Sequence, residues 1–288
     1  MKPHGRSHLS AQLSRRMLLR MAAPVRRVDV CGLRIAYRRA GSGEPLVLLH
    51  GAFSDSREWR GQLDGLSSTF DVIAVDCPGC GQSDDPPDGF TLQDFSDCLA
   101  GFLAVLGVQH PHVCGLSFGS MYALALYRHH PEIARSLILA SAYAGWAGSL
   151  PPEELARRKQ WVSEVLDRPV DEWGPGFLAT VYADSAPPEA LAEGMDILRD
   201  VRPDGFRPAT AAFLDADLRD VLPLITVPTL LLYGGRDERS PIDVAKDMHA
   251  QISGSRLVVL PDVGHGINSE APESFNAAAL DFLTEIGH

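Results

Sequence analysis

Short apolar runs alternate with amphipathic segments from about residue 45 to the end of the chain. Each run is bounded by glycine or proline, as strands of a buried sheet commonly are. The runs predict strands over residues 45–50, 71–75, 112–114 with their flanks, 136–140, 229–233 and 257–260. Near-continuous apolar strands separated by helices are typical of a parallel sheet that is covered on both faces. The pattern therefore predicts an α/β protein with a doubly wound, mostly parallel sheet.

Upstream of these runs, segments 28–30 and 33–38 flank the dipeptide Cys31-Gly32. Two short strand-like segments joined by such a turn predict an antiparallel hairpin. We expect this hairpin at one edge of the sheet, because it precedes the alternating strands and helices.

The alternation breaks between residues 144 and 216, where prolines and tryptophans separate helical segments such as 153–166 and 189–199. This stretch has no strand pattern. Open α/β sheets bind ligands at the carboxyl ends of their strands, so a helical insertion between two core strands predicts a lid over that edge. The predicted organisation is a basic, disordered tail over residues 1–23, a core over 24–143 and 217–288, and a helical cap over 144–216.

Composition narrows the class of protein. The chain has 288 residues, of which 45% are hydrophobic and 22% charged, so we expect a globular protein and not a disordered, collagen-like or coiled-coil one. No apolar run reaches the roughly 18 residues of a spanning helix, and no membrane association is expected. Five cysteines, an odd number, suit a reducing compartment, which predicts a cytoplasmic protein.

The formal net charge of -11 is unevenly distributed. Seven basic residues precede the first acidic residue, Asp29, so the rest of the chain has 19 basic and 37 acidic side chains. A body this acidic repels phosphate backbones, and we expect no nucleic-acid partner. Segment 14–20 is similar to a twin-arginine export signal, but Pro24, Arg26 and Arg27 interrupt the apolar stretch that such a signal needs. A disordered tail, or a start codon placed too early, is the simpler interpretation.

Cys77-Pro78-Gly79-Cys80 has the spacing of a redox or zinc-binding pair. Redox pairs open a helix that lowers the pKa of the first thiol, whereas this pair is followed by a loop over 81–87. A zinc site would need a second pair or histidines at ligand spacing, and the sequence has neither. We therefore expect no redox or metal function at this pair.

The strongest chemical signal is Gly115-Leu116-Ser117-Phe118-Gly119. It follows the apolar run at 112–114 and precedes a helical pattern over 120–130 that ends at Pro131. G-x-S-x-G between a strand and a helix is a nucleophile elbow, in which glycines permit a tight, strained turn that presents the serine hydroxyl. Ser117 is therefore the candidate nucleophile.

A serine hydroxyl is a weak nucleophile unless an imidazole takes its proton and a carboxylate orients that imidazole. Asp237 follows the strand at 229–233, and His265 follows the strand at 257–260. We predict that Ser117, Asp237 and His265 meet at the carboxyl ends of the strands. Alternatives for the two partner roles are the acids Asp215, Asp217 and Asp262 and the histidines His50, His110, His112, His129, His130 and His249.

The tetrahedral intermediate of such a reaction needs backbone amides that hold its oxyanion. One amide is expected from Phe118, which follows the nucleophile at the N-terminus of its helix. The turn after residues 45–50 supplies the other, which we assign to Ala52, with Phe53 as the alternative. His50 is expected to brace this turn through a side-chain hydrogen bond.

Together these motifs resemble the α/β-hydrolase superfamily, in its capped, single-domain branch, over about residues 25–286. The resemblance rests on His50-Gly51, the D-x-P-G-x-G-x-S pattern at 76–83, the elbow at 115–119, Asp237 followed by Pro241, and Gly264-His265. Dehalogenases and epoxide hydrolases of the superfamily use an aspartate nucleophile, so Ser117 argues against both. Arg202-Pro203-Asp204-Gly205-Phe206 and Asp217-Leu218-Arg219 also resemble enol-lactonases of aromatic catabolism.

The resemblance implies hydrolysis of a carboxylic ester, thioester or lactone through an acyl-enzyme on Ser117, with no metal or organic cofactor. Phe53, Trp146, Trp161 and Trp173 are predicted to contact a small to medium, largely apolar acyl substrate. Capped relatives with the same three residues also cleave carbon-carbon bonds or run cofactor-free perhydrolysis. A ligand receptor with slow turnover on the same fold is an alternative of another class. The sequence does not indicate an oligomeric state.

Overall fold

The computed structural model describes residues 23–287, in which eight strands form one sheet in the spatial order β1-β2-β4-β3-β5-β6-β7-β8. The pairs β1–β2 and β2–β4 are antiparallel, and the other five neighbouring pairs are parallel. The strands are β1 Val25–Val30, β2 Leu33–Gly41, β3 Glu44–Leu49, β4 Phe70–Val75, β5 His112–Leu116, β6 Ser136–Ala140, β7 Thr229–Gly234 and β8 Arg256–Leu260. The predicted α/β fold with a mostly parallel sheet is confirmed.

The hairpin that the sequence predicts lies at one edge of the sheet. β1 pairs with β2 so that Val28 lies opposite Ile35, and the chain turns at Cys31 and Gly32. Both turn residues have positive φ angles, 51° and 78°. Two left-handed residues in succession match the right-handed twist of the strands that they join, which is why this dipeptide makes a tight hairpin turn.

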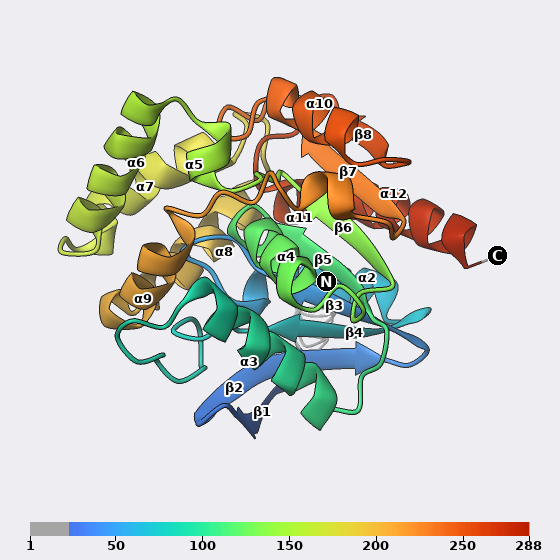
Figure 1. The fold of residues 1–288 in the computed structure, drawn as a ribbon. Coiled ribbons are helices and arrows are strands. Elements are labelled where there is room, and N and C mark those ends of the chain that lie inside the picture. The colour runs from blue at the N-terminus through green and yellow to red at the C-terminus, as the bar shows by residue number, and fades with distance from the viewer. Residues whose placement is uncertain (1–22, 288) are drawn as a thin grey trace, which may run out of the picture.

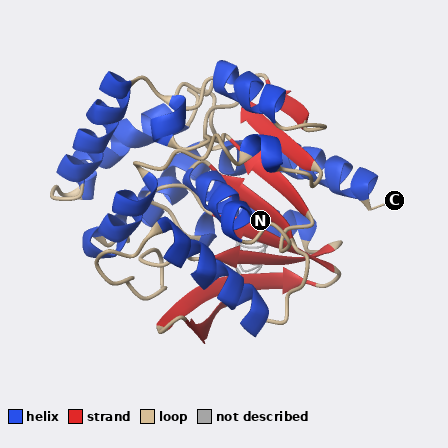
Figure 2. Cartoon of the chain, viewed as in Figure 1, coloured by secondary structure: helices blue, strands red, loops and turns tan. Residues whose placement is uncertain are grey.

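Helices lie on both faces of the sheet (Figures 1 and 2). Apolar side chains of α2 and α12 pack on one face, and those of α3, α4 and α10 pack on the other. β5 and β6, in the middle of the sheet, are buried at every residue, as strands covered on both faces must be. The helices around the sheet are η1 Ser56–Trp59, α2 Arg60–Leu66, α3 Leu92–Val105, α4 Phe118–His129, η2 Leu222–Leu224, α10 Ile242–Gln251, α11 Ile267–Glu270 and α12 Pro272–Ile286.

Five α-helices lie in the chain between β6 and β7, and Figure 1 shows them gathered to the left of the sheet. They are α5 Trp146–Ser149, α6 Pro152–Val165, α7 Val170–Val181, α8 Pro188–Arg199 and α9 Pro203–Phe213. We call them the helical insertion. α6 and α8 match the predicted segments 153–166 and 189–199. α7 continues through Pro175, which the sequence pattern treats as a break, and α9 contains an internal proline, Pro208.

The buried apolar face of α7, which includes Trp173 and Phe177, explains how this helix tolerates an internal proline, because tertiary packing outweighs local propensity. The division of the chain into a core and a cap at residues 143/144 and 216/217 stays a prediction. Nearly all of the predicted basic tail, 1–22, lies outside the described residues. Among residues 23–287, no helix has the length and apolar character needed to cross a membrane.

Candidate active site

Ser117 sits at a sharp turn between β5 and α4, with φ of 50° and ψ of -109°. A left-handed φ is costly for a residue with a side chain, and the surrounding packing must hold it there. That packing requires glycine on both sides. A Cβ on Gly115 would overlap the carbonyl oxygen of Gly119, and a Cβ on Gly119 would overlap that of Leu49 on β3. The elbow is therefore held by the close approach of α4 to two adjacent strands.

We predict that Gly119→Ala destabilises the protein by about 3 kcal/mol or more, since the new methyl group can be accommodated only by moving α4 or β3. The measurement is the free energy of unfolding in urea. Gly176→Ala is the matched control, because a Cβ at this position in α7 meets nothing within 4 Å. The control should be neutral or slightly stabilising. Equal effects of the two changes would contradict the tight contact at the elbow.

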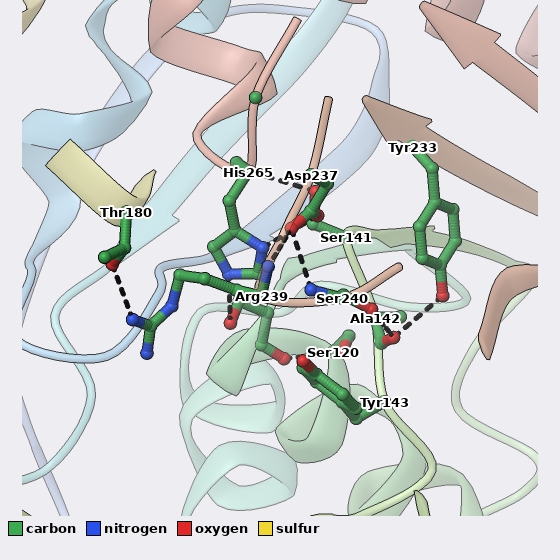
Figure 3. Close-up of polar contacts among 12 residues, drawn as sticks. Ser120, Ser141, Ala142, Tyr143, Thr180, Tyr233, Asp237, Arg239, Ser240 and His265 are labelled. Atoms are coloured by element: carbon green, nitrogen blue, oxygen red, sulfur yellow. Dashed lines mark hydrogen bonds and ion pairs between the residues drawn. The ribbon is translucent and has the colours of Figure 1, made fainter. Parts of the chain in front are cut away.

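The structure brings Ser117, His265 and Asp237 into one hydrogen-bonded chain. His265 Nε2 lies 2.8 Å from Ser117 Oγ, and His265 Nδ1 lies 2.8 Å from Asp237 Oδ2. Figure 3 shows the imidazole of His265 beside the carboxylate of Asp237. The Asp237 side chain is fully buried, and that of His265 is 6% exposed. This geometry allows proton transfer from the hydroxyl to the imidazole and stabilisation of the resulting imidazolium by the carboxylate.

Asp237 is held as an anion by its surroundings. Its Oδ1 accepts hydrogen bonds from the amides of Arg239, at 2.9 Å, and Ser240, at 2.7 Å. Burial alone would raise the pKa of Asp237, but His265 and the two amides outweigh burial and leave this pKa below its usual value. The other candidate acids lie elsewhere. Their partners are arginine or lysine side chains: Asp262 pairs with Arg236, Asp215 with Lys159, and Asp217 with Arg219.

The loop that carries His265 is tied to the helical insertion. Val181 O, at the end of α7, accepts hydrogen bonds from the amides of His265, at 2.7 Å, and Gly266, at 3.0 Å. Glu270 Oε2 accepts from the amides of Gly264 and Ala183, at 3.0 and 3.2 Å. The end of α7 thus helps to position the imidazole. No local pattern in the sequence signals the contacts of Val181 and Ala183 with this loop, because these partners are more than 80 residues apart.

The two expected oxyanion-binding residues, Ala52 and Phe118, line the same cavity as Ser117 and His265. Within residues 23–287 neither of their amides donates to a protein acceptor, so both are free to bind a substrate oxygen. His50 braces the Ala52 turn: its Nε2 accepts from the amide of Cys77, at 3.1 Å, and its Nδ1 lies 2.8 Å from Gly51 O. An accepting Nε2 leaves the proton on Nδ1, and burial lowers the pKa of His50, which favours this neutral form.

Glu58 belongs to this site but was not predicted from the sequence. Its Oε2 accepts a hydrogen bond of 2.8 Å from the amide of Gly51, directly before Ala52, and its side chain lines the cavity. Burial is the main reason that the pKa of Glu58 is raised to about 7; the Gly51 amide opposes the rise, and Asp55 adds to it. Glu58 therefore supports the oxyanion turn and titrates near neutral pH.

This raised pKa predicts a pH-dependent stability. Because folded Glu58 binds its proton more tightly than the unfolded side chain, its contribution is present below about pH 4.5 and is lost as the pH rises through about 7. Relative to the wild type, Glu58→Gln should gain up to about 3 kcal/mol in unfolding free energy between pH 4.5 and 8. Urea unfolding at both pH values measures this, with the exposed Glu189→Gln as control. A constant difference between Glu58→Gln and the wild type would refute the assignment.

The cavity beside Ser117 is mostly apolar. Of the predicted substrate contacts, Phe53, Trp146 and Trp161 line it. Trp173 does not line the cavity. Its ring packs against those of Phe53 and Phe177, at centroid distances of 5.3 and 5.9 Å, and so supports two residues of the cavity wall. The sequence missed Phe177, which does line the cavity and stacks on Trp161 at 5.7 Å. The spacing of aromatic residues along a helix does not show which of their rings faces the cavity.

The segments that resemble enol-lactonases lie mainly outside this cavity. Arg202 binds Asp85 at 2.6 Å, and the Asp217–Arg219 pair, at 2.7 Å, is partly exposed to solvent. Phe206 is the member of these segments that lines the cavity. The thiols of the Cys77–Cys80 pair are both buried, and burial raises the pKa of each, which disfavours thiolate chemistry at this turn.

Known proteins resemble this chain in sequence and in fold. It is 30% identical to the AB hydrolase superfamily protein YisY of Bacillus subtilis strain 168, over 84% of this chain and 92% of that protein. It is 31% identical to the pimeloyl-acyl-carrier-protein methyl ester esterase of Yersinia enterocolitica, over 85% and 95% of the two chains. The solved structure of the enol-lactonase from Burkholderia xenovorans LB400 matches with a TM-score of 0.81 at 25% identity, over 90% of this chain and 100% of that one.

The family model described as alpha/beta hydrolase fold matches residues 44–272, which is most of the chain and includes the elbow, Asp237 and His265. The chain is therefore a hydrolase that belongs to the alpha/beta hydrolase fold family.

Proposed function

We propose that this protein hydrolyses a carboxylic ester, thioester or lactone through an acyl-enzyme on Ser117. The observation that carries the proposal is the chain of two 2.8 Å contacts that joins Ser117, His265 and Asp237 beside a mostly apolar cavity. An activated hydroxyl at the wall of such a cavity is suited to attack a carbonyl carbon.

In the first half of the reaction, His265 Nε2 takes the proton of Ser117 while Oγ attacks the substrate carbonyl. The amides of Ala52 and Phe118 hold the oxyanion that forms. His265 then gives the proton to the leaving oxygen or sulfur, and the bond to the leaving group breaks. In the second half, His265 deprotonates a water molecule, which attacks the acyl-enzyme and restores Ser117. The steps use groups of this chain and water.

The similar proteins support this range of substrates. The Yersinia relative is named as a methyl ester esterase, and the Burkholderia structure as an enol-lactonase. Both names describe cleavage of an acyl-oxygen bond. Aromatic and aliphatic side chains around the cavity favour a small to medium acyl substrate with apolar parts. We further propose that α5–α9 act as the cap that encloses it, since Trp146, Trp161 and Phe177 come from these helices.

The test combines labelling with turnover. The purified protein is incubated with a fluorophosphonate, its intact mass is recorded, and hydrolysis of p-nitrophenyl acetate and butyrate is followed. One adduct and rapid turnover are expected. One adduct with negligible turnover of esters and lactones would instead favour a carbon-carbon hydrolase or a ligand receptor. No adduct would refute Ser117 as an activated nucleophile.

A further inference from the structure

Arg239 is a cation in the wall of the active-site cavity. It lies two residues after Asp237, and its side chain lines the cavity together with Ser117 and His265. Figure 3 shows the side chain extending from the loop that carries Asp237 toward Thr180, a residue of α7. There its Nη1 donates a 2.8 Å hydrogen bond to Thr180 Oγ1, and the guanidinium carbon lies 4.8 Å from the centre of the Phe177 ring.

In the described part of the chain, no carboxylate lies within 4.0 Å of the guanidinium of Arg239. The acids that share the region are already engaged. Asp237 accepts from His265 and two amides, Glu58 accepts from the Gly51 amide, and Glu193 pairs with Arg60 at 2.9 Å. A guanidinium has five N–H donors, and the hydroxyl of Thr180 takes one. Arg239 thus keeps most of its hydrogen-bonding capacity and has no direct ion-pair partner among residues 23–287.

The neighbouring charges add to this imbalance. Arg158 Nη2 donates to the backbone oxygen of Arg239 at 3.3 Å, which brings a second positive charge close to Arg239. Arg158 has its own partners, Glu154 at 2.7 Å and the hydroxyl of Tyr143 at 3.1 Å. Burial, and then the charge of Arg158, lower the pKa of Arg239. Arg239 is partly buried, and a partly buried cation without an ion-pair partner is unfavourable; an anion that enters the cavity would offset this cost.

We propose that Arg239 binds a carboxylate carried by the substrate, so that the protein acts on esters or lactones of dicarboxylic or hydroxycarboxylic acids. This rests on the proposed function of Ser117 and names the substrate class of that same site. Arginine is suited to the task because its planar fork can hold both oxygens of a carboxylate. The apolar cavity leaves a bound carboxylate with few competing donors, which strengthens the contact.

A purely structural role for Arg239 makes a different prediction. If the side chain served only to connect the loop of Asp237 to α7, Thr180→Val would reproduce the effect of Arg239→Gln, because both changes remove the 2.8 Å hydrogen bond. If Arg239 binds the substrate, Thr180→Val should leave the preference for charged substrates in place. Arg236→Gln is the matched control, because it removes one positive charge from the same loop. Arg236 directly precedes Asp237, pairs with Asp262, and does not line the cavity.

The experiment compares kcat/KM for charged and neutral partners of equal shape. One pair carries the charge on the acyl part, the p-nitrophenyl esters of glutarate and glutaramate. The other carries it on the alcohol part, 3-acetoxypropanoate and 3-acetoxypropanamide. The wild type should prefer the carboxylate of at least one pair by about 10- to 100-fold, the range of one charge-assisted hydrogen bond. Arg239→Gln should bring the ratio close to 1, and Arg239→Lys should restore part of it.

Binding is measured separately from turnover. The carboxylate and amide p-nitrophenyl esters are titrated calorimetrically into Ser117→Ala, with and without Arg239→Gln. The carboxylate should bind at least about 10-fold more tightly than the amide, and only when Arg239 is present. The inference is overturned if neither substrate pair shows a preference for the charged member, or if Arg236→Gln or Thr180→Val abolishes that preference as fully as Arg239→Gln does.

The two proposals fail in different ways. Turnover of neutral esters without a preference for carboxylates would overturn the role of Arg239 and leave the serine hydrolase intact. Absence of both a fluorophosphonate adduct and turnover would overturn the serine mechanism. In that case calorimetry alone decides on Arg239, since charge-dependent binding does not need an activated Ser117.

Discussion

Ser117→Ala is expected to lower ester turnover by about 10⁴-fold or more while the protein stays folded. The alanine variant retains the cavity, Ala52 and Phe118, but has no oxygen that His265 can activate and no atom on which an acyl-enzyme can form. The fold should tolerate the change, because Ser117 Oγ has one hydrogen-bond partner among residues 23–287, His265 Nε2, at 2.8 Å. The left-handed backbone conformation, with a φ of 50°, is about equally unfavourable for serine and alanine.

Three measurements check this result. kcat for p-nitrophenyl butyrate is determined in long assays, the fluorophosphonate adduct is sought by intact mass, and the urea midpoint reports stability. Ser185→Ala, at an exposed position of the helical insertion, is the control and should match the wild type in all three. Turnover of Ser117→Ala within about tenfold of the wild type would end the assignment of Ser117 as nucleophile.

Asp237→Asn is expected to reduce kcat by about 10³- to 10⁴-fold with a small change in KM. The reason lies in the hydrogen bonds of the carboxylate. Oδ1 accepts from the amides of Arg239 and Ser240, so the asparagine oxygen must occupy that position. The amide nitrogen then faces His265 Nδ1 and donates to it. The imidazole proton is thereby moved to Nε2, where it faces Ser117 and prevents the histidine from acting as a base.

Asp262→Asn is the matched control for this change. Asp262 is closer than Asp237 to His265 in the sequence, but its side chain is 83% exposed and pairs with Arg236 at 3.3 Å. Its removal should change kcat less than about twofold, as is usual for an exposed pair. If Asp262→Asn proved the damaging change and Asp237→Asn the mild one, the proposed orienting acid would be wrong.

Several parts of this protein could be read from short stretches of sequence. The strand at 136–140 is predicted by its continuous apolar run, and the helix that follows Ser117 is predicted by a helical pattern that ends at Pro131. The elbow also has a local sequence signature, G-x-S-x-G between a strand and a helix, although its second glycine is needed for a contact with a distant segment, Leu49 of β3. Chain order alone placed Asp237 and His265 after core strands.

Other features depend on segments that are distant in sequence, and no periodicity reports them. α7 passes through Pro175 because Trp173 and Phe177 pack in the interior, and the choice between these rings as cavity lining is a matter of helix rotation. The support of Ala52 by Glu58, and of His265 by Val181, depends on the paths of irregular loops. Loop backbone groups find their partners only after the helices and strands have packed.

The sequence by itself therefore determined the α/β class, the strand order along the chain, the elbow and the candidate nucleophile, since these follow from local burial and residue chemistry. The tertiary structure decided which acid reaches His265, which aromatic rings line the cavity, and that Arg239 stands there with no carboxylate partner from residues 23–287. Burial, hydrogen bonding and charge at these positions are produced by several segments at once, and so they exist only in the folded chain.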